Sequence, residues 1–150
     1  DIPTKTIAMP ARRDVDDPQV QRGEMIFEAA GCVRCHAPTL VTSDYPDVPE
    51  LANQTIHPYT DMLLHDLGQR LTDGRSDFLG YGAEWQTPPL WGIGLSTTVN
   101  GHGNFLHDGR ARSIMEAILW HDAEAQRPRE YVQALGAADR DAPLAFRHSL

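Results

Sequence analysis

The sequence predicts one all-α domain in which four to five helices are joined by long loops. Apolar residues recur at helical spacing in several segments, and residues that commonly cap helices precede them. No stretch gives a convincing strand, and many of the 11 prolines lie between the helical segments, where they end helices. With 150 residues and 41% apolar content, the chain has the size and the core of a single domain.

The first elements in the chain are an arm and a helix. Residues 1–17 combine prolines, arginines and aspartates without an apolar period, so we expect an extended arm on the body of the protein or a severed linker. The body is expected to cover residues 18–150. Its first helix should begin with Asp17 as the N-cap and Pro18 at the first helical position, and Gly31 should end it.

The segment Cys32-Val33-Arg34-Cys35-His36 follows this helix directly. At C-x-x-C-H spacing, two thiols can bond to the vinyl-derived carbons at one edge of a haem, while the next imidazole binds the iron. A thioredoxin-like redox pair would need a βαβ frame, a zinc site would need a distant histidine as a further ligand, and a plain disulfide leaves His36 without a role. We therefore interpret the motif as one haem c, bound through Cys32 and Cys35, with His36 on the iron.

A long loop and a second helix are expected next. Four prolines between residues 37 and 59 favour a loop, which we expect to cover a haem edge. A helix is expected to begin at Thr60 and to end near Gly74. Its apolar residues repeat every four positions, at Leu63, Leu67 and Leu71.

The third helix has the clearest signal. It follows residues 77–109, which show no regular period, and begins with a capping box at residues 113–116. One face carries four residues at helical spacing: Ile114, Ala117, Ile118 and His121. A fourth helix is expected to open near Pro128, and a last one to run from about residue 141 to residue 149.

A second iron ligand can be sought among the other six of the seven histidines and among the four methionines. His121 is the first candidate, because an unpartnered imidazole on an apolar stripe loses hydrogen bonds; a buried histidine bonded to a backbone carbonyl is the alternative. His107 lies in a turn that could orient it beside the haem, and His65 is a weaker ligand but a plausible hydrogen-bonding residue. Arg110 and Trp91 are candidate partners of the haem propionates; a surface arginine and a core tryptophan are the simpler alternative.

The formal net charge of −8 argues against nucleic acid and anionic membranes as partners, so a protein partner is better sought among basic surfaces. No apolar run approaches the length of a membrane span, and the first residues carry no signal-peptide pattern. The chain therefore looks like a mature or excised segment. Because haem is attached to C-x-x-C-H outside the bacterial cytoplasm, we expect a periplasmic protein.

Three further segments extend the pattern. Residues 87–92 read T-P-P-L-W-G, residues 105–111 read F-L-H-D-G-R-A, and residues 116–121 read E-A-I-L-W-H. Together with C-x-x-C-H, they resemble the di-haem oxidoreductase family sometimes labelled thiol oxidoreductase, over nearly the whole chain. That family is similar in turn to bacterial di-haem cytochrome c peroxidases, in which the helix after an F-x-H-D-G loop carries the distal methionine of the electron-transfer haem. The resemblance places His121 at that position, and so implies a bis-histidine iron in a c-type cytochrome fold.

The chain departs from this family in two respects. Members are expected to carry two C-x-x-C-H motifs and this chain has one, so it resembles only the C-terminal haem domain. The implied partner is the N-terminal haem domain of the parent protein or another redox protein. The family also tends to show H-G-G-E where residues 121–124 read H-D-A-E, so this loop is expected to differ in shape.

Three functions are compatible with these observations. The favoured one is an electron-transfer domain whose six-coordinate iron passes single electrons, within a parent oxidoreductase. The alternative is a haem enzyme, a peroxidase or a thiol oxidase, with an open or displaceable distal site and His107 or His65 as acid or base. The third is a zinc-stabilised interaction domain without haem. No catalytic residue is assigned.

Overall fold

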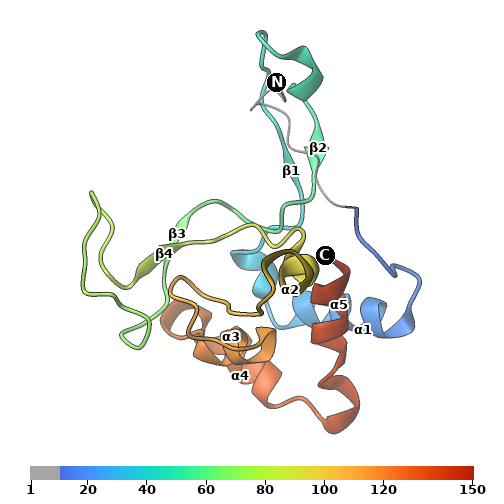
Figure 1. The fold of residues 1–150 in the computed structure, drawn as a ribbon, viewed down its shortest axis with the longest axis vertical. Coiled ribbons are helices and arrows are strands. Elements are labelled where there is room, and N and C mark those ends of the chain that lie inside the picture. Colours follow the sequence, from blue (N-terminus) through green and yellow to red (C-terminus); the bar gives the residue numbers. More distant parts are fainter. Residues whose placement is uncertain (1–10) are drawn as a thin grey trace.

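The computed structural model describes residues 11–150, and the packing of its first helix against its last lies at the centre of the fold (Figure 1). Helix α1 spans Pro18–Ala29, and helix α5 spans Ala142–Ser149. These two helices make the most extensive contact between any two elements of the described chain. The contact requires Gly23, because a Cβ atom there would clash with the backbone of Ala142 and lie 2.6 Å from the Cβ atom of Phe146.

Helix α1 begins and ends as its sequence predicts. The Asp17 carboxylate accepts a hydrogen bond from the Gln19 backbone N–H at 2.7 Å, and Pro18 occupies the first helical position. Gly31 follows the helix with a φ of 82°, a left-handed conformation that favours glycine. The chain can therefore leave α1 in a sharp turn, and this turn opens the C-x-x-C-H segment.

Of the predicted arm, residues 1–10 lie outside the described residues, and residues 11–17 contact the two central helices. The backbone N–H of Arg13 donates to the carbonyl of Ser149 in α5 at 2.8 Å. The Arg12 guanidinium forms two hydrogen bonds with the Glu24 carboxylate in α1, at 2.8 and 3.1 Å. This part of the arm thus joins α1 to α5.

Helices α3 (Ile114–Trp120) and α4 (Gln126–Gln133) form a second layer beside the central pair (Figure 1). The Ser113 hydroxyl accepts from the Glu116 backbone N–H at 3.1 Å, as a capping box predicts. The Glu116 carboxylate accepts a hydrogen bond from the backbone N–H of Arg112 at 3.0 Å, not from that of Ser113. The clearest helix in the sequence therefore forms at its predicted place.

Two apolar clusters make up the core. One joins α1 and α5 and consists of Val20, Phe27, Tyr59, Leu90, Phe146 and Leu150. The other joins α3 and α4 to the end of α1 and consists of Ala30, Ile114, Ile118 and Val132. Cys32 packs against both clusters, so the C-x-x-C-H segment lies where they meet.

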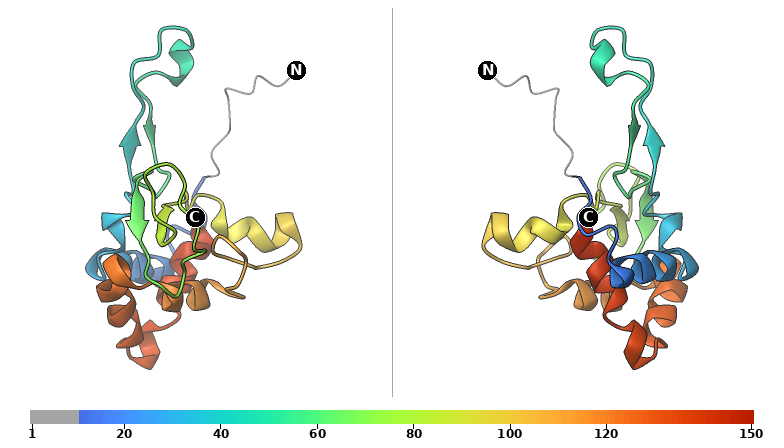
Figure 2. Two further views of the ribbon diagram at one scale, coloured as in Figure 1. Left: turned by 90° about the vertical axis from the view of Figure 1, so that its left-hand side faces the viewer. Right: turned by 90° about the vertical axis from the view of Figure 1, so that its right-hand side faces the viewer.

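The expectation of an all-α domain is wrong. Besides five α-helices, residues 11–150 contain two small antiparallel sheets, one of β1 (Leu40–Val41) with β2 (Thr55–Ile56) and one of β3 (Leu64–Asp66) with β4 (Glu84–Gln86). The β1–β2 hairpin extends away from the helical body (Figures 1 and 2). The remaining elements are α2 (Ser96–Asn100) and five 3₁₀ turns: η1 (Cys32–Arg34), η2 (Pro49–Leu51), η3 (Ile93–Leu95), η4 (Ala123–Ala125) and η5 (Ala137–Asp139).

The helix predicted from residue 60 to residue 74 does not form. The Thr60 hydroxyl accepts from the Met62 backbone N–H at 2.9 Å, and the Asp61 carboxylate accepts from the Leu63 backbone N–H at 3.0 Å. Such local side-chain bonds compete with a helical backbone, and Met62 has a φ of 64°. The chain then pairs as β3 with β4. Among the described residues, no helix is both long and apolar enough to cross a membrane.

Candidate functional site

The turn η1 brings the two thiols and the first imidazole of the motif together. The backbone N–H groups of Cys35 and His36 both donate to the carbonyl of Cys32, at 3.3 and 3.0 Å. Both cysteines are free and partly buried, and burial raises the pKa of each thiol. The structure therefore presents two protonated thiols and a histidine on one turn at the junction of the two cores.

His36 is held in one orientation by the base of the β1–β2 hairpin. Its Nδ1–H donates to the backbone carbonyl of Tyr59 at 3.1 Å. Burial lowers the pKa of His36 to about 4, so the ring is neutral at pH 7. A neutral imidazole with Nδ1–H on a carbonyl can offer its Nε2 lone pair to a metal.

His121 is held in the same way at the end of α3. Its Nδ1–H donates to the carbonyl of Ala117 at 2.7 Å, and burial lowers its pKa. The charge of a protonated His121 would also lower the pKa of His36. Within residues 11–150, the Nε2 atom of neither ring makes a hydrogen bond. A hydrogen bond from His121 to a backbone carbonyl was the alternative to iron ligation. This bond forms, but it uses only Nδ1 and leaves Nε2 without a partner within residues 11–150.

Arg129 stabilises the backbone beside His121. Its guanidinium donates to the His121 carbonyl at 3.0 Å and lies 3.0 Å from the Asp122 carboxylate. This ion pair is mostly shielded from solvent on the arginine side, with 13% of that side chain exposed. The chain direction after α3, and with it the position of the His121 ring, is therefore anchored from α4.

Arg147 is a residue of this site that the sequence analysis missed. It belongs to α5, is only 6% exposed, and has its Nη1 atom buried without a hydrogen-bond partner among residues 11–150. Burial lowers the pKa of Arg147, and the neighbouring Cys32 thiol opposes that shift. The positive charge of Arg147 in turn lowers the pKa values of Cys32, His36 and His121. The guanidinium lies 5.7 Å from the centre of the Phe27 ring, and that ring centre lies 6.2 Å from the centre of the His36 ring.

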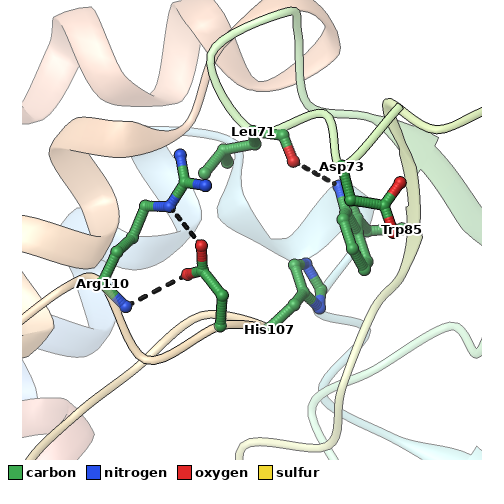
Figure 3. Close-up of a pocket in the computed structure, with 6 residues that line it drawn as sticks. Leu71, Asp73, Trp85, His107 and Arg110 are labelled. Atoms are coloured by element: carbon green, nitrogen blue, oxygen red, sulfur yellow. Dashed lines mark hydrogen bonds and ion pairs between the residues drawn. The ribbon is translucent and has the colours of Figure 1, made fainter. Parts of the chain in front are cut away.

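His107 lies on the wall of a small pocket, facing β4 (Figure 3). Its ring stacks on that of Trp85, with centroids 3.7 Å apart and planes 11° apart, and the Trp85 indole donates to the Leu71 carbonyl at 3.1 Å. Burial lowers the pKa of His107, and a protonated His121 would lower it further. Stacking on Trp85 therefore holds the His107 ring in place.

Arg110 and Trp91, the candidate partners of the haem propionates, make no hydrogen bond with His36 or His121. The Arg110 guanidinium pairs with the Asp108 carboxylate at 2.6 Å, donates to the Arg70 carbonyl at 2.6 Å, and lies 5.1 Å above the Trp120 ring. Its side chain is therefore already engaged (Figure 3). Trp91 is partly buried, and its indole makes no hydrogen bond within the described residues.

His65 lies on β3 between two carboxylates. Its Nε2 is 2.8 Å from Asp61 and its Nδ1 is 2.9 Å from Glu124. Burial alone would lower the pKa of His65, but the hydrogen bonds to Glu124 and Asp61 raise it. Cys35 is close to this group, because its sulfur, an Asp61 oxygen and a His65 nitrogen all lie within 4.8 Å of one another. The structure thus places His65, which is hydrogen-bonded to two carboxylates, beside the thiol of Cys35.

Comparison with known proteins identifies a family. The family model described as "Di-haem oxidoreductase, putative peroxidase" matches residues 2–150. No curated protein and no solved structure matches the chain. The family match confirms the resemblance that the motifs indicate, and it supports haem as the cofactor and an oxidoreductase as the class of protein.

The residues present fit a haem. Two free thiols and the His36 imidazole lie on one turn, and the Nε2 atoms of His36 and His121 make no hydrogen bond within residues 11–150. Thiols and imidazoles match the vinyl groups and the iron of the cofactor respectively.

Proposed function

Because the chain belongs to the di-haem oxidoreductase family, we propose that it is a covalent haem c electron-transfer domain with His36 and His121 as the two iron ligands. The observation that carries the proposal is the shared geometry of these two histidines. Each ring donates Nδ1–H to a backbone carbonyl, each is kept neutral by burial, and each retains Nε2 for the iron.

The remaining residues of the motif bind and orient the cofactor. When bound, a haem supplies one-electron redox chemistry that the side chains themselves lack. Cys32 and Cys35 bind its edge covalently, and their shared turn fixes its orientation relative to His36. Two imidazole ligands leave no open coordination position, which favours transfer of electrons over reaction with a substrate.

A second haem is the natural electron partner. The family is di-haem and this chain contains one C-x-x-C-H motif, so the other haem belongs to an N-terminal haem domain or to another redox protein. Attachment of haem c takes place outside the bacterial cytoplasm, which supports a periplasmic location.

The iron ligation can be tested by spectroscopy of the ferric protein, produced in a host with haem-attachment machinery. We expect a six-coordinate, low-spin absorption and EPR spectrum. His121→Ala should make the iron high-spin while the haem stays covalently bound, because the thioether bonds do not involve this histidine. His107→Ala is the matched control, since it removes an imidazole that is not a proposed ligand and should leave the spectrum low-spin.

Each contrary result has a clear meaning. A low-spin spectrum in His121→Ala would assign the second ligand to another residue. A high-spin spectrum of the unmodified protein would mean an open iron and would favour the enzymatic alternative, a peroxidase or a thiol oxidase. Loss of haem on denaturing gels would refute covalent attachment, which should depend on Cys32 and Cys35.

A further inference from the structure

The two carboxylate contacts of His65 require a protonated ring. Its Nε2 lies 2.8 Å from an Asp61 carboxylate oxygen, and its Nδ1 lies 2.9 Å from a Glu124 carboxylate oxygen. A carboxylate only accepts, and a neutral imidazole has one N–H, so both contacts are hydrogen bonds only when both nitrogens carry a proton. Burial opposes this charge, but the bonds to Glu124 and Asp61 raise the pKa of His65 above its ordinary value of 6.5. The cluster of Asp61, His65 and Glu124 therefore holds a titratable proton.

The other histidines of the described chain have different partners. His36 and His121 donate to backbone carbonyls, and burial lowers the pKa of each. The exposed His57 contacts only the hydroxyl of Thr39, at 3.1 Å. Among residues 11–150, His65 is the one histidine that is hydrogen-bonded to a carboxylate. Its surroundings favour the binding of a proton, whereas those of His36 and His121 favour a neutral ring.

The proposed thioether bond of Cys35 places this proton beside the haem. The Cys35 sulfur, an Asp61 oxygen and a His65 nitrogen all lie within 4.8 Å of one another. The Asp61 backbone N–H also donates to the Cys35 carbonyl, at 2.8 Å. Once Cys35 is bonded to the haem, its sulfur is part of the thioether edge, so the cluster borders that edge. An electron added to the haem makes it more negative by one unit, and a nearby imidazolium is then held more strongly.

Glu124 connects the cluster to solvent. Its side chain is 54% exposed, whereas those of Asp61 and His65 are each 16% exposed. Cys35 is the other titratable residue beside the ring, and as a thioether it no longer titrates. The position on β4 that pairs with His65 is Trp85, which carries no charge. A proton can therefore reach Nδ1 of His65 from the Glu124 side while Nε2–H remains on Asp61.

We propose that His65 takes up one proton when the haem accepts one electron, so that the domain transfers a proton together with the electron. This inference rests on the proposed haem site. The electron comes from an external one-electron donor and converts ferric to ferrous iron. The proton comes from solvent by way of Glu124 and converts neutral His65 to the imidazolium. Oxidation releases both.

The test uses potentiometric titrations of the full haem-loaded chain, from below pH 6.5 to well above it. His65→Gln removes the proton site and keeps a polar side chain. His57→Gln is the matched control, because it removes an exposed histidine without a carboxylate partner. The measurements are the midpoint potential at each pH and the pKa of the His65 ring in both redox states, from ¹⁵N NMR of labelled histidines.

The ferrous state should hold the proton more tightly, so a rise in pH that removes the proton disfavours reduction. Between the ferric-state and ferrous-state pKa values of His65, we expect the equilibrium constant for reduction to fall up to tenfold per pH unit, which is about 59 mV for one electron. His65→Gln should lose this pH-dependent segment, and His57→Gln should keep it. Glu124→Gln should move the segment to lower pH, because one of the two carboxylates that raise the pKa of His65 is gone.

The same pH-dependent segment in His65→Gln would overturn the proposal, and so would one pKa for the His65 ring in both redox states. If His65→Gln does not accumulate, an unmoved segment in Glu124→Gln would overturn it equally. In each of these cases the covalent haem remains, and with it the proposed electron-transfer domain. A protein without covalent haem would refute both proposals, so the two failures are distinguishable.

Discussion

Ala123 shows how a single residue departs from the family pattern at a structural cost. It stands where the family tends to have the second glycine of H-G-G-E, and its φ is 47°. Left-handed backbone costs an L-residue about 1–2 kcal/mol, so we expect Ala123→Gly to raise the free energy of unfolding by about 1 kcal/mol. Urea denaturation of the variant measures this change. Ala137→Gly, at an exposed position outside the left-handed region, should not stabilise the protein.

A stabilisation confined to Ala123→Gly would assign the strain to this loop, and a lower stability of that variant would contradict it. The loop matters for the site because Glu124, the next residue, binds the His65 ring and the backbone N–H of Asp66.

Single residues also differ in how much of their structural environment can be predicted from the sequence. The partial burial of His121 could be predicted, because it lies on an apolar stripe. Arg147 could not, because its burial depends on how α5 packs against the rest of the chain.

At the scale of elements, the predictions succeed where a capping residue marks the start of a helix. Asp17 and Ser113 both cap helices that form at their predicted places. The prediction over residues 60–74 fails although its leucines have helical spacing. There the side chains of Thr60 and Asp61 bind the backbone within two residues, and pairing with β4 provides an alternative to the helical hydrogen bonds. Spacing alone cannot separate these outcomes when the pairing strand lies about 20 residues further along the chain.

The packing of α1 against α5 depends on one glycine, which leads to a prediction at this scale. In Gly23→Ala, the new methyl group would clash with the Ala142 backbone and approach the Phe146 side chain. We expect this overpacking to lower the free energy of unfolding by about 1–3 kcal/mol, despite the better helix propensity of alanine. Denaturation curves measure the loss. Gly136→Ala is the control, since nothing lies within 4 Å of its added Cβ, and an equal loss there would disprove the packing explanation.

At the scale of the whole molecule, the site depends on parts that are distant in sequence. The C-x-x-C-H turn follows α1, the second histidine ends α3, and the buried arginine comes from α5. Short motifs predict the first two, because each depends on the spacing of residues that are close together in the sequence. The third enters only through the tertiary fold, in which Arg147 is 6% exposed and its guanidinium lies 5.7 Å from the centre of the Phe27 ring. Motifs therefore point to the iron ligands proposed above, whereas the burial of Arg147 becomes visible only in the folded chain.

The net charge of −8 leads to a prediction about electron exchange by the whole haem-loaded protein. Opposite charges attract over a range that salt shortens, from about 30 Å at 0.01 M to about 8 Å at 0.15 M ionic strength. We expect the rate constant for reaction with a cationic metal complex, hexaammineruthenium, to fall severalfold over this range. Reaction with anionic ferricyanide should accelerate over the same range, and stopped-flow spectroscopy measures both. If the cationic complex instead reacted faster as salt increased, the haem edge would lie in a locally basic surface. The physiological partner would then have to be acidic there, against the basic partner that the overall charge favours.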